Sequence, residues 1–73
     1  MINAKEWYSL IDIVEIGTKQ KLTMLESIYL VRKWIETGKL KAVKVGKGKG
    51  IRYSIKGEWL IKFIAKWEDG SFH

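Results

Sequence analysis

The chain is short and strongly basic, with 73 residues and a formal net charge of +6 at pH 7. This length predicts a single domain covering residues 1–73. The sequence contains no cysteine, and its one histidine is the last residue, so we expect neither a disulfide nor a metal site or other cofactor. No apolar run approaches the roughly 20 residues that span a bilayer, so we expect a cytoplasmic protein without a membrane partner.

The first helix is predicted over residues 10–16. Ser9 can cap its N-terminus, and Asp12, three residues later, completes a pattern close to the capping box. Gly17 is expected to end the helix. Its buried stripe is expected to consist of Leu10, Ile13 and Val14, with Ile16 as a further candidate.

Two segments beside this helix have less regular patterns. Residues 1–8 are expected to form an irregular lead-in, with Trp7 and Tyr8 packed beside the first helix. Residues 17–26 allow two interpretations. They form a solvated loop that returns to the core, or the second helix begins near Thr23 and is kinked or broken before Ser27.

The second helix is predicted over residues 28–37. Ser27 is a hydroxyl residue that can accept hydrogen bonds from the free N–H groups of the first turn. Gly38 supplies the left-handed residue that commonly ends a helix. The apolar stripe consists of Val31, Trp34 and Ile35.

A β-hairpin is predicted next, because apolar residues alternate with polar ones on both sides of the glycine-rich turn GKGKG (46–50). With this five-residue turn, one face of the hairpin is expected to carry Val43, Val45, Ile51, Tyr53 and Ile55. The opposite face would then carry Lys44, Arg52 and Ser54.

A third helix is predicted over residues 57–67, with a core stripe at Leu60, Phe63, Ile64 and Trp67. Three helices with a lysine-tipped, two-stranded hairpin predict the α+β fold of a small winged helix, in which the hairpin is the wing.

Most of the positive charge lies in one segment, residues 31–56. This segment holds nine basic residues and one acid, a net charge of +8, whereas residues 1–30 and 57–73 each carry −1. A concentrated positive field favours a polyanionic partner over a small ligand. The sequence therefore predicts a nucleic-acid-binding surface on the second helix and the hairpin.

These elements, in this order, resemble the excisionase-type winged helix-turn-helix family of the MerR-like DNA-binding superfamily. The resemblance covers about residues 8–64 and is carried by SLIDIVEIG (9–17), the Gly-Lys-Leu step of GKLKA (38–42), IRYSI (51–55) and KGEWLIKFI (56–64). The segment between the first two helices is longer than the family's usual turn. The long dimerisation helix of MerR-type regulators has no counterpart, so the resemblance implies a bare DNA-binding module.

The resemblance implies that the second helix enters the major groove and that the wing contacts the backbone or the adjacent minor groove. An arginine or tyrosine would read base edges, and most lysines would position the module on phosphates. The implied contact residues are Ser27, Ile28, Tyr29, Arg32 and Lys33 on the helix, and Lys44, Lys47, Lys49 and Arg52 on the wing.

The implied function is DNA recombination or transcription regulation, as an excisionase-like directionality factor of a mobile element or a small phage or plasmid regulator. Its implied partners are double-stranded DNA and an integrase, or further copies of the protein in cooperative arrays. A protein–protein interaction module of a mobile-element complex and an RNA-binding protein are the alternatives. RNA binding predicts exposed aromatics on a sheet face, whereas Tyr53 is expected with the apolar set. No aspartate or glutamate has a candidate nucleophile, general base or metal ligand near it in the sequence, so we expect no enzymatic activity.

Overall fold

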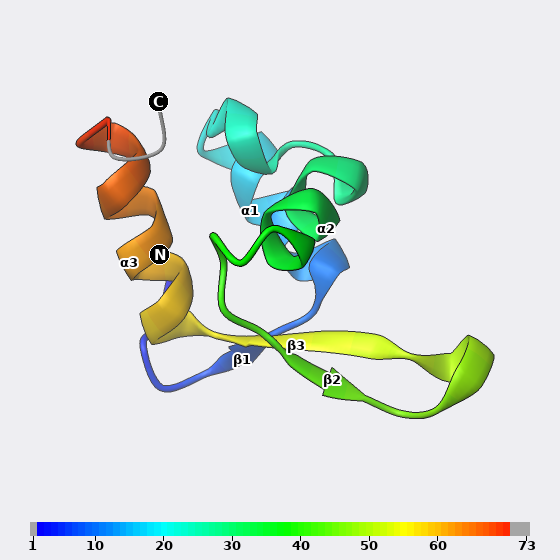
Figure 1. Cartoon of the computed structure of the whole chain (residues 1–73). Coiled ribbons are helices and arrows are strands. Elements are labelled where there is room, and N and C mark those ends of the chain that lie inside the picture. The colour runs from blue at the N-terminus through cyan, green and yellow to red at the C-terminus, as the bar shows by residue number, and fades with distance from the viewer. Residues whose placement is uncertain (1, 71–73) are drawn as a thin grey trace.

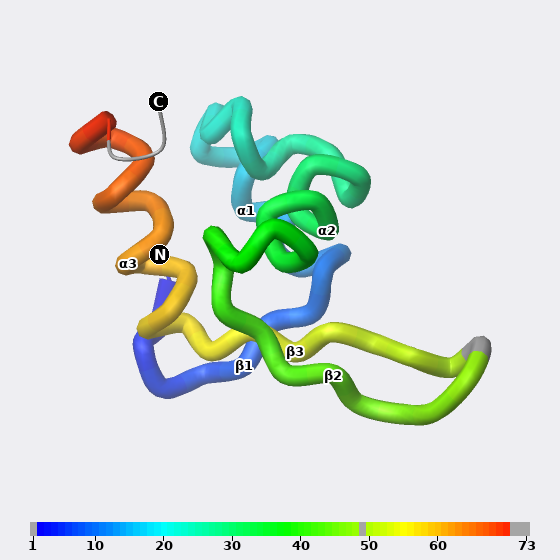
Figure 2. Tube along the Cα trace, viewed as in Figure 1, coloured from blue at the N-terminus to red at the C-terminus, as the bar shows by residue number. Residues whose placement is uncertain are grey.

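The computed structural model describes residues 2–70, apart from the side chain of Lys49. Its elements are β1 (Trp7–Tyr8), α1 (Leu10–Lys19), the 3₁₀-helix η1 (Thr23–Leu25), α2 (Ile28–Glu36), β2 (Val43–Val45), the 3₁₀-helix η2 (Gly48–Gly50), β3 (Arg52–Lys56) and α3 (Gly57–Glu68). The helices α1 and α2 lie together over the sheet, α3 stands to one side, and the β2–β3 hairpin extends past the helices (Figures 1 and 2). This is the arrangement of a small winged helix.

The core lies where the three α-helices meet the sheet. Its fully buried members come from every part of the described chain: Ile13, Leu25, Val31, Leu40, Ile55, Leu60 and Phe63. Trp34 closes the α2 side of the core, because its indole Nε1 donates to the Met24 carbonyl oxygen at 2.9 Å and its ring packs against Trp67 at 5.4 Å. Within residues 2–70, no helix is both long enough and apolar enough to cross a membrane.

The helix caps confirm several of the sequence predictions. Ser9 and Asp12 form a reciprocal capping box, with the Asp12 N–H 3.2 Å from Ser9 Oγ and the Ser9 N–H 3.1 Å from Asp12 Oδ2. Ser27 caps α2 by accepting a hydrogen bond from the Tyr29 N–H at 3.2 Å. Gly38 follows α2 with φ +79°, as predicted for a left-handed C-terminal residue.

Gly17 does not end the first helix, which continues to Lys19, so this prediction was wrong. The residue that takes the left-handed conformation is Lys21, with φ 56°. Gly17 is instead buried where α1 meets η1, and a Cβ added there would lie 2.6 Å from the Leu25 carbonyl oxygen. Glycine is needed at this position for close approach of two backbones rather than for helix termination.

Replacing Gly17 by alanine should therefore destabilise the protein, although alanine is normally the better helix former. Overpacking costs about 1–3 kcal/mol, which exceeds the gain of roughly 1 kcal/mol for Gly→Ala inside a helix. Thermal unfolding should show a melting temperature lower by about 5 °C. A higher melting temperature would mean that η1 moves away from α1 at little cost.

Residues 17–26 follow neither simple interpretation in full. Thr23–Leu25 form a separate 3₁₀-helix, and α2 begins only at Ile28. Met24 and Leu25 are buried, and η1 packs against both α1 and α2. The interpretation with a helical turn at Thr23 and a break before Ser27 was the closer of the two.

The N-terminal lead-in contains a third strand that the sequence analysis missed. Trp7 pairs with Lys56 and Tyr8 with Ile55, so the sheet has the order β1-β3-β2 instead of two strands. The N–H groups at the start of α3 donate to this segment: Gly57 to the Glu6 carbonyl oxygen at 2.8 Å and Glu58 to the Ala4 carbonyl oxygen at 3.0 Å. Lys56, the residue at the N-cap position of α3, makes no side-chain capping hydrogen bond. Main-chain carbonyl oxygens of the N-terminal segment therefore cap this helix.

The predicted faces of the hairpin were wrong for β2. Val43 lies opposite Ser54, Lys44 opposite Tyr53 and Val45 opposite Arg52. Because opposed residues in an antiparallel pair share a face, Lys44 lies on the face of Tyr53 and Ile55, and the valines lie on the other. The cause is the loop, which runs from residue 46 to residue 51 and is one residue longer than GKGKG. One extra loop residue moves every side chain of β2 to the opposite face of the sheet from the one predicted relative to β3.

Candidate nucleic-acid interface

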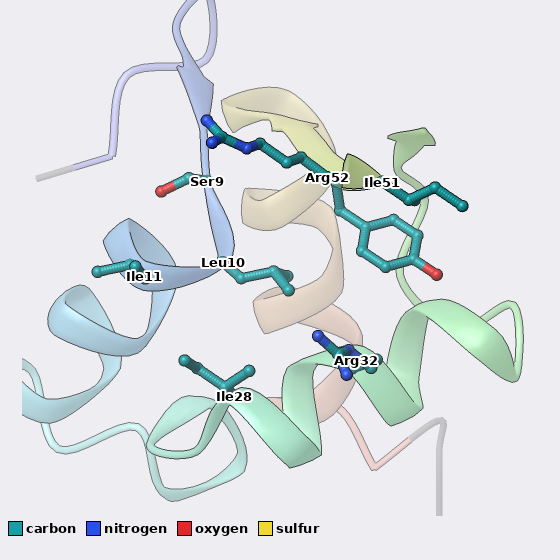
Figure 3. A pocket seen from close by; sticks show the side chains of 8 residues that line it. Ser9, Leu10, Ile11, Ile28, Arg32, Ile51 and Arg52 are labelled. Carbon is teal, nitrogen blue, oxygen red and sulfur yellow. The ribbon is translucent and has the colours of Figure 1, made fainter. Parts of the chain in front are cut away.

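A groove of about 490 Å³ opens between the first turns of α1 and α2 and the start of β3. Figure 3 shows its lining residues, with Arg32 on α2 at one end and the Arg52 side chain reaching toward the start of α1 at the other. The wall between them is largely apolar. The groove is lined by Ser9, Leu10, Ile11, Ile28, Arg32, Ile51, Arg52 and Tyr53.

Four of the five contact residues predicted for the second helix lie on one side of the N-terminal half of α2, and the fifth, Ser27, is the half-buried residue that caps it. Positions 28, 29, 32 and 33 repeat at the spacing that brings side chains together on one helix face. All four side chains are exposed, and that of Tyr29 is 75% exposed. The opposite side of the helix is held in the core by Val31. The structure therefore leaves this face of α2 available to a partner.

The wing carries the remaining predicted contact residues. Lys44, Lys47 and Arg52 are exposed, and Lys44 projects on the sheet face that carries Tyr53. Arg52 lies on the other face of β3 but still reaches the rim of the groove. The prediction for the Lys49 side chain falls outside the described part of the structure.

Five of the predicted contact residues are basic and have described, exposed side chains on α2 or the wing: Arg32, Lys33, Lys44, Lys47 and Arg52. The ion pairs between described side chains lie elsewhere, from Lys19 to Glu15 on α1 and from Lys62 to Glu58 on α3. None of the five is neutralised by a described carboxylate. Their charges are therefore available to an anionic ligand.

The basic segment 31–56 is divided between two surfaces, which its sequence does not indicate. The ammonium groups of Lys39 and Lys41 lie over the rings of Trp34 and Trp59, at 5.3 and 4.9 Å from the ring centres. Both lysines line a separate groove with Lys62 of α3. Cation–π contacts of this kind stabilise the link between α2 and β2. The charge facing the first groove is thus smaller than the segment total of +8.

Sequence reasoning missed five residues of the first groove, namely Ser9, Leu10, Ile11, Ile51 and Tyr53. Ile11 had a usable signal, because it falls outside the buried stripe of Leu10, Ile13 and Val14 and is 69% exposed. A single exposed apolar residue is common, but Ile11 lies in one groove with Leu10, Ile28 and Ile51, and a group of apolar side chains of this kind is typical of a binding surface.

Comparisons of the chain with models of known protein families, with curated proteins and with solved structures found no match.

Proposed function

We propose that the protein binds double-stranded DNA, with α2 in the major groove and the β2–β3 wing on the backbone or in the adjacent minor groove. The observation that carries this proposal is that α2 and the wing together present five exposed basic residues, none neutralised by a described carboxylate, two of which, Arg32 and Arg52, line one groove beside the free face of α2. A polyanion that is wide enough to touch α2 and the wing together suits this distribution better than a small ligand.

The dimensions of α2 agree with this mode of binding. An α-helix with its side chains is about 10–12 Å in diameter, and the major groove of B-DNA is about 12 Å wide and admits a single helix. In this arrangement Arg32 reads a guanine edge and Tyr29 lies beside it, while Lys33, Lys44 and Lys47 hold phosphates. Arg32 is suited to the first role because its guanidinium can donate two parallel hydrogen bonds to guanine O6 and N7.

The cellular role that we propose is that of a small cytoplasmic DNA-binding module, either an excisionase-like recombination directionality factor or a phage or plasmid transcription regulator. The resemblance in residues 8–64 supports this role, and the winged-helix arrangement agrees with it. Its partners would be duplex DNA and an integrase, or further copies of the protein in cooperative arrays.

The test of specific recognition is the change Arg32→Lys, which keeps the net charge but removes the pair of parallel hydrogen bonds that a guanidinium can donate to guanine. A preferred duplex is first selected from a random library, and affinity for it is compared with a scrambled duplex at one salt concentration. If Arg32 reads a base, the variant should lose about 1–3 kcal/mol on the preferred duplex and relax the preference at one base pair.

Arg52→Lys is the matched control, because Arg52 is the arginine at the opposite end of the same groove. If it holds phosphate, this change should weaken binding slightly and equally on both duplexes. An unchanged specificity ratio in Arg32→Lys would transfer base reading to Tyr29 or Lys33. Unchanged ratios after substitution of all three residues would refute insertion of α2 into the major groove.

A further inference from the structure

Exposed isoleucines stand at the N-terminal ends of both helices that frame the groove. Ile11 of α1 is 69% exposed and Ile28 of α2 is 42% exposed. Both line the groove that also holds Arg32 and Arg52. Large apolar side chains gathered on a strongly basic surface indicate a partner that is anionic overall but offers apolar groups at the same place.

Neither isoleucine is needed by its own helix. The cores of α1 and α2 are filled from other positions, by Ile13 and by Val31, which are both fully buried. The caps are supplied by Ser9 and Ser27. A β-branched residue also adds little to helix stability in a first turn, where acidic residues interact favourably with the helix dipole. The core and the caps of the two helices therefore do not depend on the exposed parts of these isoleucines.

Duplex DNA offers one apolar group on its major-groove edges, the C5 methyl of thymine. Building on the DNA-binding function proposed above, we propose that Ile28, assisted by Ile11, contacts thymine methyl groups and so makes thymine part of the preferred site. The two guanidinium groups of the same groove supply the charge complementarity for the surrounding phosphates and guanine edges.

The spacing along α2 predicts where this thymine lies. Ile28 and Arg32 are one helical turn apart on the same face, with Cβ atoms separated by about 5–6 Å. Figure 3 shows both side chains on the α2 side of the groove, with Ile11 beyond Ile28 at the start of α1. Successive base pairs are about 3.4 Å apart, so the thymine should lie one or two base pairs from the one that Arg32 reads.

The experiment is a uracil scan of the selected duplex. Each thymine is replaced in turn by deoxyuridine, which removes only the methyl group and leaves the pairing with adenine intact. One or two positions near the base pair read by Arg32 should each lose affinity by about fourfold, which is the effect of withdrawing one buried methyl-sized group from contact. The remaining thymines should tolerate the change.

Variants then assign the effect to a side chain. In Ile28→Ala, the thymine and uracil duplexes should bind equally well at the position that Ile28 contacts, and Ile11→Ala should do the same at a second position if both are used. Val45→Ala is the matched control, because Val45 is 54% exposed but lies on the opposite face of the sheet from Tyr53. Thermal unfolding checks that each variant is folded, and the scan on the unaltered protein needs no variant at all.

The outcomes separate this inference from the function on which it rests. A flat uracil scan on a duplex that is bound selectively, or a selected site without thymine, would overturn the thymine contact and leave DNA binding in place. A uracil effect that persists in both isoleucine variants would overturn the assignment to these residues. Failure to bind any duplex would overturn both proposals.

Discussion

Raising the salt concentration from about 50 mM to 200 mM should weaken duplex binding by about 150- to 500-fold. Each phosphate neutralised by a basic residue contributes about −0.9 to the slope of log K against log[salt]. The five described basic residues around the groove and wing therefore predict a slope near −4.5, or near −3.6 if Arg32 reads a base rather than a phosphate. Fluorescence anisotropy of a labelled duplex over a salt series measures this slope.

Two lysine variants distinguish local contacts from net charge. Lys47→Ala removes a charge from the wing and should reduce the magnitude of the slope by about 1. Lys19→Ala lowers the net charge equally, but its ammonium lies 3.2 Å from Glu15 on the outer side of α1, so the slope should not change. Equal effects of the two variants would show that only the overall charge matters, and binding that is flat over the salt series would contradict an electrostatic interface.

Replacing Gly57 by alanine should have the largest effect on stability. A Cβ at this position would overlap the Asn3 carbonyl oxygen and would lie 3.1 Å from Tyr8 Cε2. The segment that pairs as β1 and accepts the first hydrogen bonds of α3 would have to move away. We expect a loss of about 3 kcal/mol or more, out of a total stability of about 4–11 kcal/mol for a domain of this size.

Thermal or urea unfolding measures this loss, and the melting temperature should fall by about 10–25 °C. Gly50→Ala is the control, because a Cβ added at residue 50 meets nothing within 4 Å and the change should leave the melting temperature nearly unaltered. A Gly57→Ala protein as stable as the control would show that residues 3–8 contribute little to the fold.

Much of the fold follows from local chemistry that is visible in the sequence. The capping serines, the left-handed glycine after α2 and the apolar stripes each depend on a few neighbouring residues, and the structure confirms them. The errors concern contacts between distant parts of the chain. Gly17 was assigned to a helix end because its contact with Leu25 has no local signature. The strand at Trp7 was missed because two residues show no alternation.

The candidate site shows the same limit. The exposed face of α2 could be predicted because it is the complement of a buried stripe. The faces of the wing could not, because they depend on whether Ile51 belongs to the loop or to the strand, a difference of one residue. Ile11 joined the site only through the packing of α1 beside α2 and β3. Lys39 and Lys41 belong to the basic segment, but they lie on another surface, where they contact Trp34 and Trp59.

The pairing of β1 with β3 has a consequence for synthesis on the ribosome. Trp7 and Tyr8 are synthesised early. Their strand partners, Ile55 and Lys56, are translated more than 45 residues later, and so are the N–H groups of Gly57 and Glu58, which donate to the carbonyl oxygens of Glu6 and Ala4. Nascent polypeptides that stop after the wing carry all three strands and most of the positive charge, but they lack α3, which packs on β3 and donates hydrogen bonds to the segment before β1. Under the DNA-binding function proposed above, prematurely terminated products should bind nucleic acid without sequence preference, and selective recognition should require α3.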